Sequence, residues 1–234
     1  MSSSIFKAHI LTLFPELFPG PMGHSITGRA LSEGKWSCTA TDIRDFATDK
    51  RKTVDDTPYG GGAGMVMRAD VVAEAIEHAK KETPNAPVVF MTPTGTPFNQ
   101  GMANRWAAGE GVILLCGHYE GIDQRVLDAL VDEEVSIGDY VLTGGEIAVY
   151  PGLDATIRQL PGVLGNDETL AEESFSPALE GLLEYPHYTR PEEWRGQTVP
   201  EVLKSGHHAK IDAWRKEQSI AKTQKVRPEL LKKK

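Results

Sequence analysis

GVILLCGHYEGIDQRVLDALVDEEVSIGDYVLTGGE, residues 111–146, is the segment from which we derive the fold. Its apolar run Val112–Cys116 is short and continuously hydrophobic, which is typical of a strand buried on both faces of a parallel sheet. After a glycine turn, Ile122–Glu133 carries apolar residues at helical spacing. Tyr140–Leu142 then predicts a second short strand that leads into another glycine turn. The segment therefore predicts a strand, a helix and a strand joined by glycine-rich turns.

These glycine turns predict a ligand pocket, because ligands of open α/β sheets bind at the carboxyl ends of the strands. The chain has neither G-x-x-x-x-G-K-[ST] nor G-x-G-x-x-G, the two standard phosphate-binding motifs. The loops are also apolar and poor in cations. This pattern favours a nucleoside-like ligand held by main-chain groups over a polyphosphate. The alternative is that the glycines only form tight turns, and the pattern by itself leaves both interpretations open.

Strands and helices alternate through the first two thirds of the chain, which predicts an α/β fold around a parallel sheet. The other predicted strands are Ile5–Leu13, Trp36–Asp42 and Val88–Met91, the last of which ends in a third glycine turn at Thr92–Gly95. The predicted helices are Ser25–Glu33, Arg68–Lys81, Asn99–Ala108 and Glu146–Gln159. Residues 44–65 form an irregular polar segment, whose glycines suit either a mobile lid or a simple spacer.

The last third of the chain has a different character. Residues 163–176 lose periodicity and collect acidic side chains, so we predict a flexible interdomain linker there. Residues 177–234 lack strand periodicity and predict a small all-helical domain, in which Arg227–Glu229 begins a final short helix. The predicted organisation is a first domain at residues 1–162, the linker, and a second domain at residues 177–234.

The net charge of −8 hides an uneven distribution. Residues 204–234 hold ten Lys and Arg against three Asp and Glu, a balance of +7, which leaves −15 on the other 203 residues. We therefore predict a basic C-terminal arm that can contact nucleic-acid phosphates. Lys232–Lys234 are interpreted as a solubilising tail, whereas Lys210, Arg215, Lys216 and Lys222 belong to a predicted helix.

Composition argues against membrane and disulfide-stabilised classes of protein. No apolar stretch approaches the roughly 18 residues that a membrane span requires, and the N-terminal residues suit a first strand better than a signal peptide. Cys38 and Cys116 cannot form a disulfide framework, and no Cys/His spacing suits zinc. The sequence thus predicts a soluble cytoplasmic protein with no membrane partner.

Two motifs in the first quoted segment are highly specific, CGHYEGID at Cys116–Asp123 and SIGDYVLTGGE at Ser136–Glu146. With them the chain resembles the bacterial tRNA (guanine-N1)-methyltransferases of the SPOUT superfamily. The resemblance covers nearly the whole chain, with further motifs in the family's order. These are Leu13–Glu16 (LFPE), Lys52–Asp56 (KTVDD), Pro58–Gly62 (PYGGG), Pro161–Gly165 (PGVLG), Pro186–Pro191 (PHYTRP) and Ser205–His208 (SGHH).

The resemblance implies both a fold and a reaction. Members of this family bind S-adenosylmethionine in a deep trefoil knot, and because knots are rare among folds this expectation rests on the resemblance alone. Members are homodimers whose active sites use both subunits. The implied reaction is methylation of N1 of the guanosine 3′ of the tRNA anticodon, nucleotide 37, which preserves the reading frame. The implied partners are tRNA, the methyl donor and an assisting Mg²⁺ ion, for which the sequence offers no ligand set.

Methylation at guanine N1 needs a base for the N1 proton and a cation or donor near O6, where negative charge develops. By its position in the family's motifs, Arg158 is the implied cation, and arginine is a common partner of guanine O6. The implied base is Glu173, at a position where most members carry aspartate. Glutamate keeps the carboxylate and lengthens its arm, which changes the geometry more than the chemistry. The neighbouring Glu172 is the alternative base.

The resemblance also implies which residues hold the cofactor, through main-chain hydrogen bonds to adenine and ribose and through apolar enclosure. Glu120 is expected to face the cationic methionine end, and Asp139 to brace its loop. His118 is expected to position a neighbouring loop, and Cys116 is interpreted as a small buried apolar residue. The implied set is Met91, Pro93, Gly117, Tyr119, Glu120, Ile137, Gly138, Asp139, Tyr140, Val141, Leu142, Gly144 and Gly145.

Basic residues of the second predicted domain and of the irregular segment are candidates for contact with tRNA. Trp194 and Trp214 could stack on bases, but we interpret both as core residues of a small helical domain. The candidates for phosphate contact are Arg190, His207, His208, Lys210, Arg215 and Lys50–Lys52.

Two other functions compete with the implied one. A SPOUT enzyme that methylates ribose 2′-oxygens would need no carboxylate at Glu173. A non-catalytic RNA-binding protein would bind tRNA without binding the cofactor, and the intact glycine turns argue against it.

Overall fold

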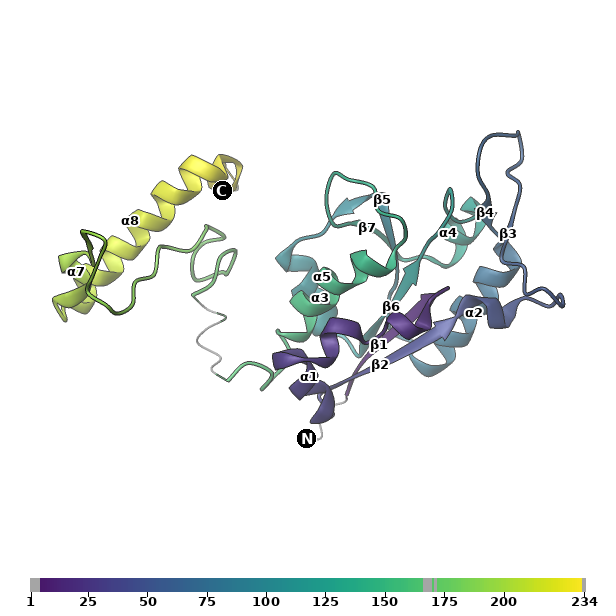
Figure 1. Ribbon diagram of the computed structural model, residues 1–234, viewed down its shortest axis with the longest axis horizontal. Helices are drawn as coiled ribbons and strands as arrows, with labels where there is room; N and C mark the ends of the chain where they lie inside the picture. The colour runs from purple at the N-terminus through teal and green to yellow at the C-terminus, as the bar shows by residue number, and fades with distance from the viewer. Residues whose placement is uncertain (1–4, 166–169, 171, 233–234) are drawn as a thin grey trace. The chain divides into compact units, whose positions relative to one another are not determined.

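The computed structural model describes residues 5–165, 170 and 172–232 (Figure 1). Contacts within the chain divide it into two compact units, Met1–Leu164 and Gly165–Lys234. Each unit is described by itself below.

A five-stranded sheet forms the centre of the first unit, with the strand order β2-β1-β6-β5-β7. All four neighbouring pairs are parallel. The middle strand, β6, is buried along its whole length, as its unbroken hydrophobicity predicts. The strands are β1 (Phe6–Thr12), β2 (Trp36–Asp42), β5 (Val88–Pro97), β6 (Gly111–Cys116) and β7 (Glu133–Ser136).

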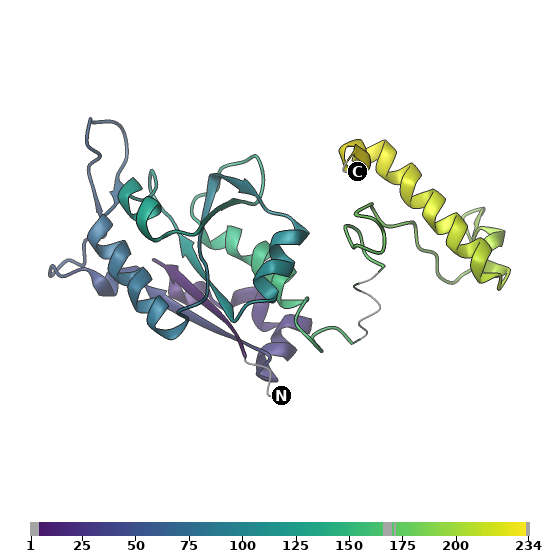
Figure 2. The same ribbon diagram turned by 180° about the vertical axis from the view of Figure 1, so that it is seen from behind.

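Helices cover both faces of this sheet (Figures 1 and 2). Successive side chains of a strand point to opposite faces. In β1, Ala8 and Ile10 therefore join a core cluster with α1, α3 and α5, whereas Leu11 joins a second cluster with α2 and α4. The helices are α1 (Ser25–Ser32), α2 (Ala69–Glu82), α3 (Gln100–Ala107), α4 (Gln124–Leu130) and α5 (Glu146–Ile157).

The structure confirms the predicted α/β fold and parallel sheet, but one predicted strand is wrong. Tyr140–Leu142 forms no strand, and Val141 is 82% exposed. The strand is instead Glu133–Ser136, which pairs with β5 at the edge of the sheet. Hydrophobicity did not predict this strand, because two of its four residues are glutamates. An edge strand can contain such residues, since it buries only part of its length. The preceding helix accordingly ends at Leu130, three residues before the predicted end at Glu133.

The turn after Met91 lies within β5 as an interruption of the ladder. Val135 of β7 pairs with both Met91 and Thr96, so residues 92–95 loop out between the two pairings. Gly95 lies so close to the β7 backbone that a Cβ atom there would collide with Glu134 and Val135. Glycine is therefore required for this close approach.

A second close approach joins α5 to the end of β6. The Gly145 amide donates a hydrogen bond to the Gly117 carbonyl at 3.1 Å. A Cβ atom on Gly145 would lie 2.7 Å from Cys116 Cα and 3.0 Å from the Gly117 nitrogen. Two backbone segments thus touch at this point with no space for a side chain between them.

The irregular segment after β2 contains only short elements. These are the 3₁₀ turn η3 (Ile43–Phe46) and the two-residue strands β3 (Asp55–Asp56) and β4 (Val66–Met67), which pair antiparallel. Two further 3₁₀ turns, η1 (Pro15–Leu17) and η2 (Gly20–Gly23), lie between β1 and α1.

The second unit contains helices α7 (Glu201–Lys204) and α8 (His208–Val226) and a 3₁₀ turn, η4 (Pro228–Lys232), at the position of the predicted final helix. The prediction of an all-helical unit is wrong, because β8 (Glu193–Trp194) and β9 (Gln197–Thr198) form a hairpin. Its two-residue turn has positive φ at Arg195 and Gly196, the conformation that favours tight hairpins. Strands of two residues are too short to show the alternation of apolar and polar side chains by which a strand is predicted. Among the helices of the described residues, none is long and apolar enough to cross a membrane.

The close approach at Gly145 leads to a first prediction. We expect Gly145→Ala to lower the free energy of unfolding by roughly 1–3 kcal/mol, because the added methyl group overpacks a contact made by backbone atoms. Gly145 has φ −73°, which alanine tolerates, so the cost is steric alone. Urea denaturation measures it. Gly165→Ala is the control, since nothing lies within 4 Å of a Cβ there; equal effects of the two variants would contradict the prediction.

Candidate functional site

The loop within β5 and the loops that follow β6 and β7 surround a cavity of about 430 Å³. This volume lies within the roughly 300–1,000 Å³ typical of sites for small molecules and cofactors. The loops are those that the glycine turns predict, at residues 92–95, 117–121 and 137–145. The cavity therefore lies at the carboxyl ends of parallel strands, where open α/β sheets bind their ligands.

The structure brings the predicted cofactor residues together around this cavity. All thirteen except Asp139 line it. Asp139 is exposed, and the hydrogen bonds that brace its loop come from two other residues. The Ser136 hydroxyl donates to the Gly138 carbonyl at 3.0 Å and accepts from the Gly138 amide at 3.2 Å, and the Tyr140 hydroxyl donates to the Ile137 carbonyl at 3.2 Å.

Several lining residues were not predicted. Ser136 and Glu134 reach the cavity from the end of β7, and Thr92 and Thr94 from the loop within β5. The sequence held a signal for them, since each lies within two residues of a predicted glycine turn or a motif boundary. Glu134 was not predicted because the strand was predicted at Tyr140–Leu142. The carboxyl end of the strand, where a ligand would bind, was therefore expected at the wrong residues.

The cavity is acidic. Glu120 and Glu134 are among its lining residues, and among the lining residues of the described chain there is no lysine or arginine. The remainder of the lining is main chain and apolar side chain, including Met91, Ile137 and Leu142. Such a lining suits a ligand with an apolar body and a positive charge, and it disfavours a polyphosphate.

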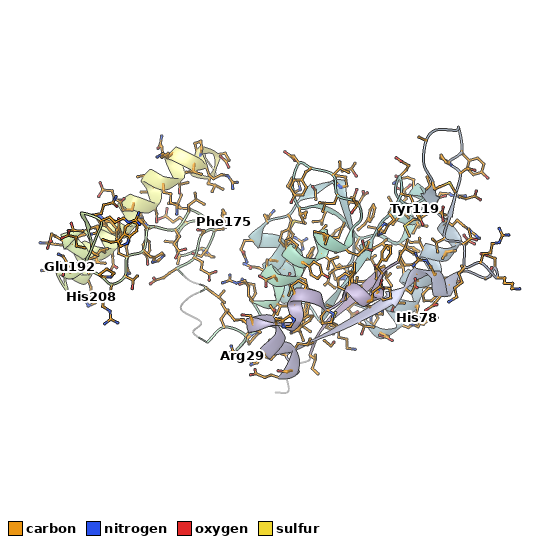
Figure 3. All side chains as sticks on the ribbon, viewed as in Figure 1. Arg29, His78, Tyr119, Phe175, Glu192 and His208 are labelled. Carbon is orange, nitrogen blue, oxygen red and sulfur yellow. The ribbon has the colours of Figure 1, made fainter. Side chains whose placement is uncertain are left out.

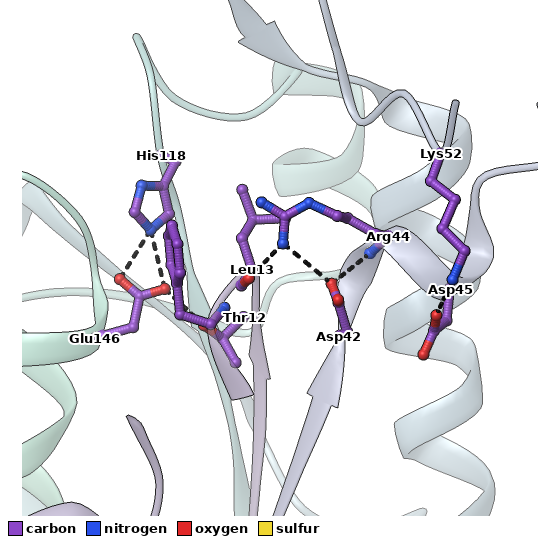
Figure 4. A network of polar contacts seen from close by, with 9 residues as sticks. Thr12, Leu13, Asp42, Arg44, Asp45, Lys52, His118 and Glu146 are labelled. Atoms are coloured by element: carbon purple, nitrogen blue, oxygen red, sulfur yellow. Dashed lines mark hydrogen bonds and ion pairs between the residues drawn. The ribbon is translucent and has the colours of Figure 1, made fainter. Parts of the chain in front are cut away.

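A buried carboxylate beneath the loops ties three segments together (Figure 4). Glu146, 4% exposed, accepts a hydrogen bond from the Thr12 hydroxyl at 2.6 Å. His118 Nε2 lies 2.9 and 2.8 Å from the two Glu146 oxygens. Thr12 Oγ1 also accepts from the Phe14 amide at 2.9 Å. Glu146 thus links the end of β1, the loop after β6 and the first turn of α5, where the helix dipole favours a negative charge.

His118 bonds to Glu146, which directly follows the neighbouring glycine turn, and packs against Phe14 at 5.2 Å between ring centroids. Cys116 is fully buried beside it. Burial, together with the nearby Glu146 carboxylate, raises the pKa of the Cys116 thiol well above its usual value. The thiol is therefore an inert packing group, as interpreted from the sequence.

The glycine-rich run at residues 60–64 ends beside the cavity. The Glu120 amide donates to the Met65 carbonyl at 2.9 Å, and the Met67 amide donates to the Gly121 carbonyl at 2.9 Å. A Cβ atom on Gly64 would collide with the Glu120 side chain. The irregular segment is thus joined to the loop after β6, which carries Tyr119, labelled in Figure 3 and 51% exposed.

Comparison with known proteins identifies the family. The family model described as tRNA (Guanine-1)-methyltransferase TrmD matches residues 6–233. The chain belongs to this family. Among its relatives, the tRNA (guanine-N(1)-)-methyltransferase of Rhizorhabdus wittichii is 58% identical over 96% of this chain and 90% of its own length. Those of Sphingopyxis alaskensis and Mesorhizobium japonicum are 57% and 56% identical, over 96% and 97% of this chain and 91% and 96% of their own lengths.

The two catalytic residues implied by this methyltransferase family lie in different units. Arg158 is the C-cap of α5 in the first unit, and its amide donates to the Asp154 carbonyl at 3.1 Å. Glu173 lies in a turn of the second unit, where its carbonyl accepts from the Ser176 amide at 3.1 Å. The adjacent Glu172 accepts a hydrogen bond from the Tyr185 hydroxyl at 2.8 Å.

The residues predicted to contact tRNA vary in their exposure. Arg190, His207, His208 and Lys210 are exposed on the second unit. Arg215 instead packs its guanidinium over the Tyr185 ring, 4.9 Å from the centroid. In the first unit, Lys52 forms an ion pair with Asp45 at 2.5 Å, which raises the pKa of Lys52.

The interpretation of Trp194 as a core residue is wrong. Its side chain is 58% exposed in the β8–β9 hairpin, with the Arg195 guanidinium 4.7 Å from its ring centroid. A two-residue strand has no second layer to cover it, so the ring stays at the surface. Trp214 is half-buried, and its ring centroid is 6.3 Å from that of Tyr188.

The buried carboxylate leads to a second prediction. We expect Thr12→Val to lower the free energy of unfolding by roughly 1–3 kcal/mol, because it removes a donor from a buried carboxylate. Thr156→Val is the control: Thr156 is equally buried, but its hydroxyl donates to a carbonyl inside α5 that keeps its helical partner. Thermal unfolding compares the two. A Thr156→Val effect as large as that of Thr12→Val would show that the loss comes from packing and not from Glu146.

Proposed function

We propose that this chain transfers a methyl group from S-adenosylmethionine to N1 of the guanosine 3′ of the tRNA anticodon, nucleotide 37, which maintains the reading frame. The observation that carries the proposal is the acidic cavity formed by three strand-end loops in a chain that matches the family along residues 6–233. We assign the proposed reaction to the cytoplasm, because its substrate is tRNA.

The residues of the cavity fit S-adenosylmethionine. Main-chain groups of the loop at residues 137–142 are suited to bind adenine and ribose, and Met91 and Leu142 enclose the apolar surface. Glu120 and Glu134 supply negative charge for the sulfonium and the ammonium group. When bound, the cofactor supplies the methyl group together with its own leaving group.

Two side chains of the chain act on the guanine. The Glu173 carboxylate would accept the proton from guanine N1, which would free the N1 lone pair for the methyl group that the bound cofactor would supply. The Arg158 guanidinium stabilises the negative charge that develops at O6. The target base must leave its stack to reach an enclosed site.

The length of α5 supports an active site made by two copies of the chain. Helix α5 begins directly after Gly145 of the cavity lining and spans 12 residues, or about 18 Å along its axis, before it reaches Arg158. That distance exceeds the reach of an arginine side chain. A second copy that brings its own Arg158 to the cavity completes the site, so we assign the chain as a homodimer with active sites at the subunit interface.

The close approaches at Gly95 and Gly145 support a deep trefoil knot as the backbone topology around the cofactor. In that topology the segment before α5 is drawn through the loops after β5 and β6, and glycine is the only residue that fits at such backbone contacts. The second unit serves as the tRNA-binding domain through its exposed basic residues. We assign no ligands to Mg²⁺, because the described residues include no cluster of three or more His, Cys, Asp or Glu suited to a metal.

The proposed reaction is tested with labelled S-adenosylmethionine and two tRNA transcripts, one with G at nucleotide 37 after another G and one with A at nucleotide 37. We expect methyl transfer only to the first, at guanine N1. Glu173→Gln and Arg158→Ala should each lower turnover by roughly 10²-fold or more, because they remove the base and the charge stabiliser. Affinity for S-adenosylmethionine, measured by calorimetry, should remain near that of the wild type.

Other outcomes point to the competing functions. Transfer to ribose, with Glu173→Gln fully active, would indicate a 2′-oxygen methyltransferase. Binding of tRNA without binding of the cofactor would indicate a non-catalytic RNA-binding protein.

The acidic lining leads to a separate prediction for cofactor binding. We expect Glu120→Gln to raise the Kd for S-adenosylmethionine about three- to tenfold, which corresponds to roughly 1 kcal/mol for one partly solvated charge pair. The Kd for S-adenosylhomocysteine, whose sulfur is uncharged, should change less. Calorimetry measures both, with the exposed Glu77→Gln of α2 as the control. An equal loss for both ligands would mean that Glu120 acts through shape rather than charge.

A further inference from the structure

The hydrogen-bonded pair of His118 and Glu146 packs directly against the glycine turn at residues 143–145. A Cβ atom on Gly144 would collide with the His118 ring and would lie 2.7 Å from Glu146 Oε2. The side chains of His118 and Glu146 are only 16% and 5% exposed. The main chain at Gly144 therefore lies on this pair, and the contact is possible because glycine has no side chain.

The same pair joins two of the loops that form the larger cavity. His118 belongs to the loop at residues 117–121, and Glu146 directly follows the loop at residues 137–145. His118 and Gly144 line the cavity, whereas Glu146 is not among the lining residues that the structure describes. A change in the distance between His118 and Glu146 would therefore move one wall of the cavity relative to another.

Glu146 is anchored independently of the two loops (Figure 4). It is the first residue of α5, and the Thr12 hydroxyl of β1 donates to it at 2.6 Å. A carboxylate accepts hydrogen bonds and does not donate them, so His118 Nε2 is the donor in the contacts of 2.9 and 2.8 Å with its two oxygens. The loop at residues 117–121 is thereby tied to a point outside the cavity.

A buried carboxylate is a costly way to fill this space. Burial of a charged group is unfavourable unless hydrogen bonds compensate for it, and an apolar side chain would pack there without that requirement. A hydrogen bond, however, fixes the length and direction of a contact, which an apolar contact does not. The pair is therefore suited to set the relative position of the two loops.

We propose that Glu146 is a positioning residue for the cofactor site: through its hydrogen bond to His118, it holds the loops at residues 117–121 and 137–145 in the arrangement that binds S-adenosylmethionine. The inference rests on the proposed function only for the identity of the cofactor, and it involves no contact with tRNA. Loops that are already in place lose little conformational freedom on binding, so positioning increases affinity.

The test is calorimetry of S-adenosylmethionine binding. We expect His118→Ala and Glu146→Ala each to raise the Kd about tenfold, and the double variant to bind no more weakly than either, because all three lack the same hydrogen bond. His118→Gln should bring the Kd to within about threefold of the wild type. The glutamine amide nitrogen is as many bonds from Cβ as Nε2 is, and it can donate to Glu146.

Ile76→Val is the control for a general loss of stability. Ile76 is 1% exposed in the core cluster beneath α2 and is not among the described residues that line the cavity. The variant should lower the melting temperature, because it removes a buried methyl group, and should leave the Kd within twofold of the wild type. A tenfold rise of the Kd in Ile76→Val would attribute the effect to stability and would overturn the inference.

Hydrogen exchange of the cofactor-free protein separates positioning from a direct contact between His118 and the cofactor. The Gly145 amide, which donates to the Gly117 carbonyl at 3.1 Å, reports whether the two loops stay together. It should exchange faster in His118→Ala than in the wild type. This measurement decides the matter even if Glu146→Ala unfolds, as thermal melting would show. Unchanged exchange at Gly145, or a wild-type Kd in His118→Ala or in a folded Glu146→Ala, would overturn the inference.

The wild-type protein separates this inference from the proposed reaction. A wild type that binds no S-adenosylmethionine would overturn the cofactor assignment and the inference together. A wild type that binds it but does not methylate the guanosine-bearing transcript would overturn the proposed reaction alone, since the variants decide the inference by binding.

Discussion

The contact between Gly145 and the end of β6 is the constraint on which the rest of the first unit depends. Because Gly145 has no side chain, its amide reaches the Gly117 carbonyl and α5 begins directly beneath the sheet. Only from that starting point does Glu146 meet Thr12 and His118. Burying a carboxylate is unfavourable unless it is fully hydrogen-bonded. Three distant parts of the chain are thus locked together by one close approach and one buried charge.

The cavity above this contact differs from the nucleotide sites of other α/β sheets in its charge. Sites for phosphates use glycine loops, helix N-termini and lysine to gather positive charge. Here the glycine turns remain, but the lining carries Glu120 and Glu134 and no lysine or arginine from the described residues. This lining is consistent with the cationic, nucleoside-bearing cofactor that we propose for the cavity.

The proposed chemistry divides between parts of the molecule that serve different purposes. The first unit carries the cavity at β5, β6 and β7 that we propose as the site of the methyl donor. Arg158 lies at the far end of α5, and Glu173 belongs to a turn fastened to α8 in the second unit.

The amino-acid sequence by itself determined the parallel sheet, the glycine turns at its strand ends and the family, because these follow from continuous apolar runs and from specific motifs. The strand β7 was missed, since its Glu133 and Glu134 give no hydrophobic signal at an edge. The β8–β9 hairpin and the exposure of Trp194 were missed, since two-residue strands have no period. Only the tertiary structure decided that Thr12, His118 and Glu146 meet, and that the Tyr185 hydroxyl donates to the Glu172 carboxylate. The periodicity of apolar residues in a sequence reports only on local structure, such as which face of a helix or strand is buried. The hydrogen bonds named above join residues far apart in the sequence, which only the fold brings close together.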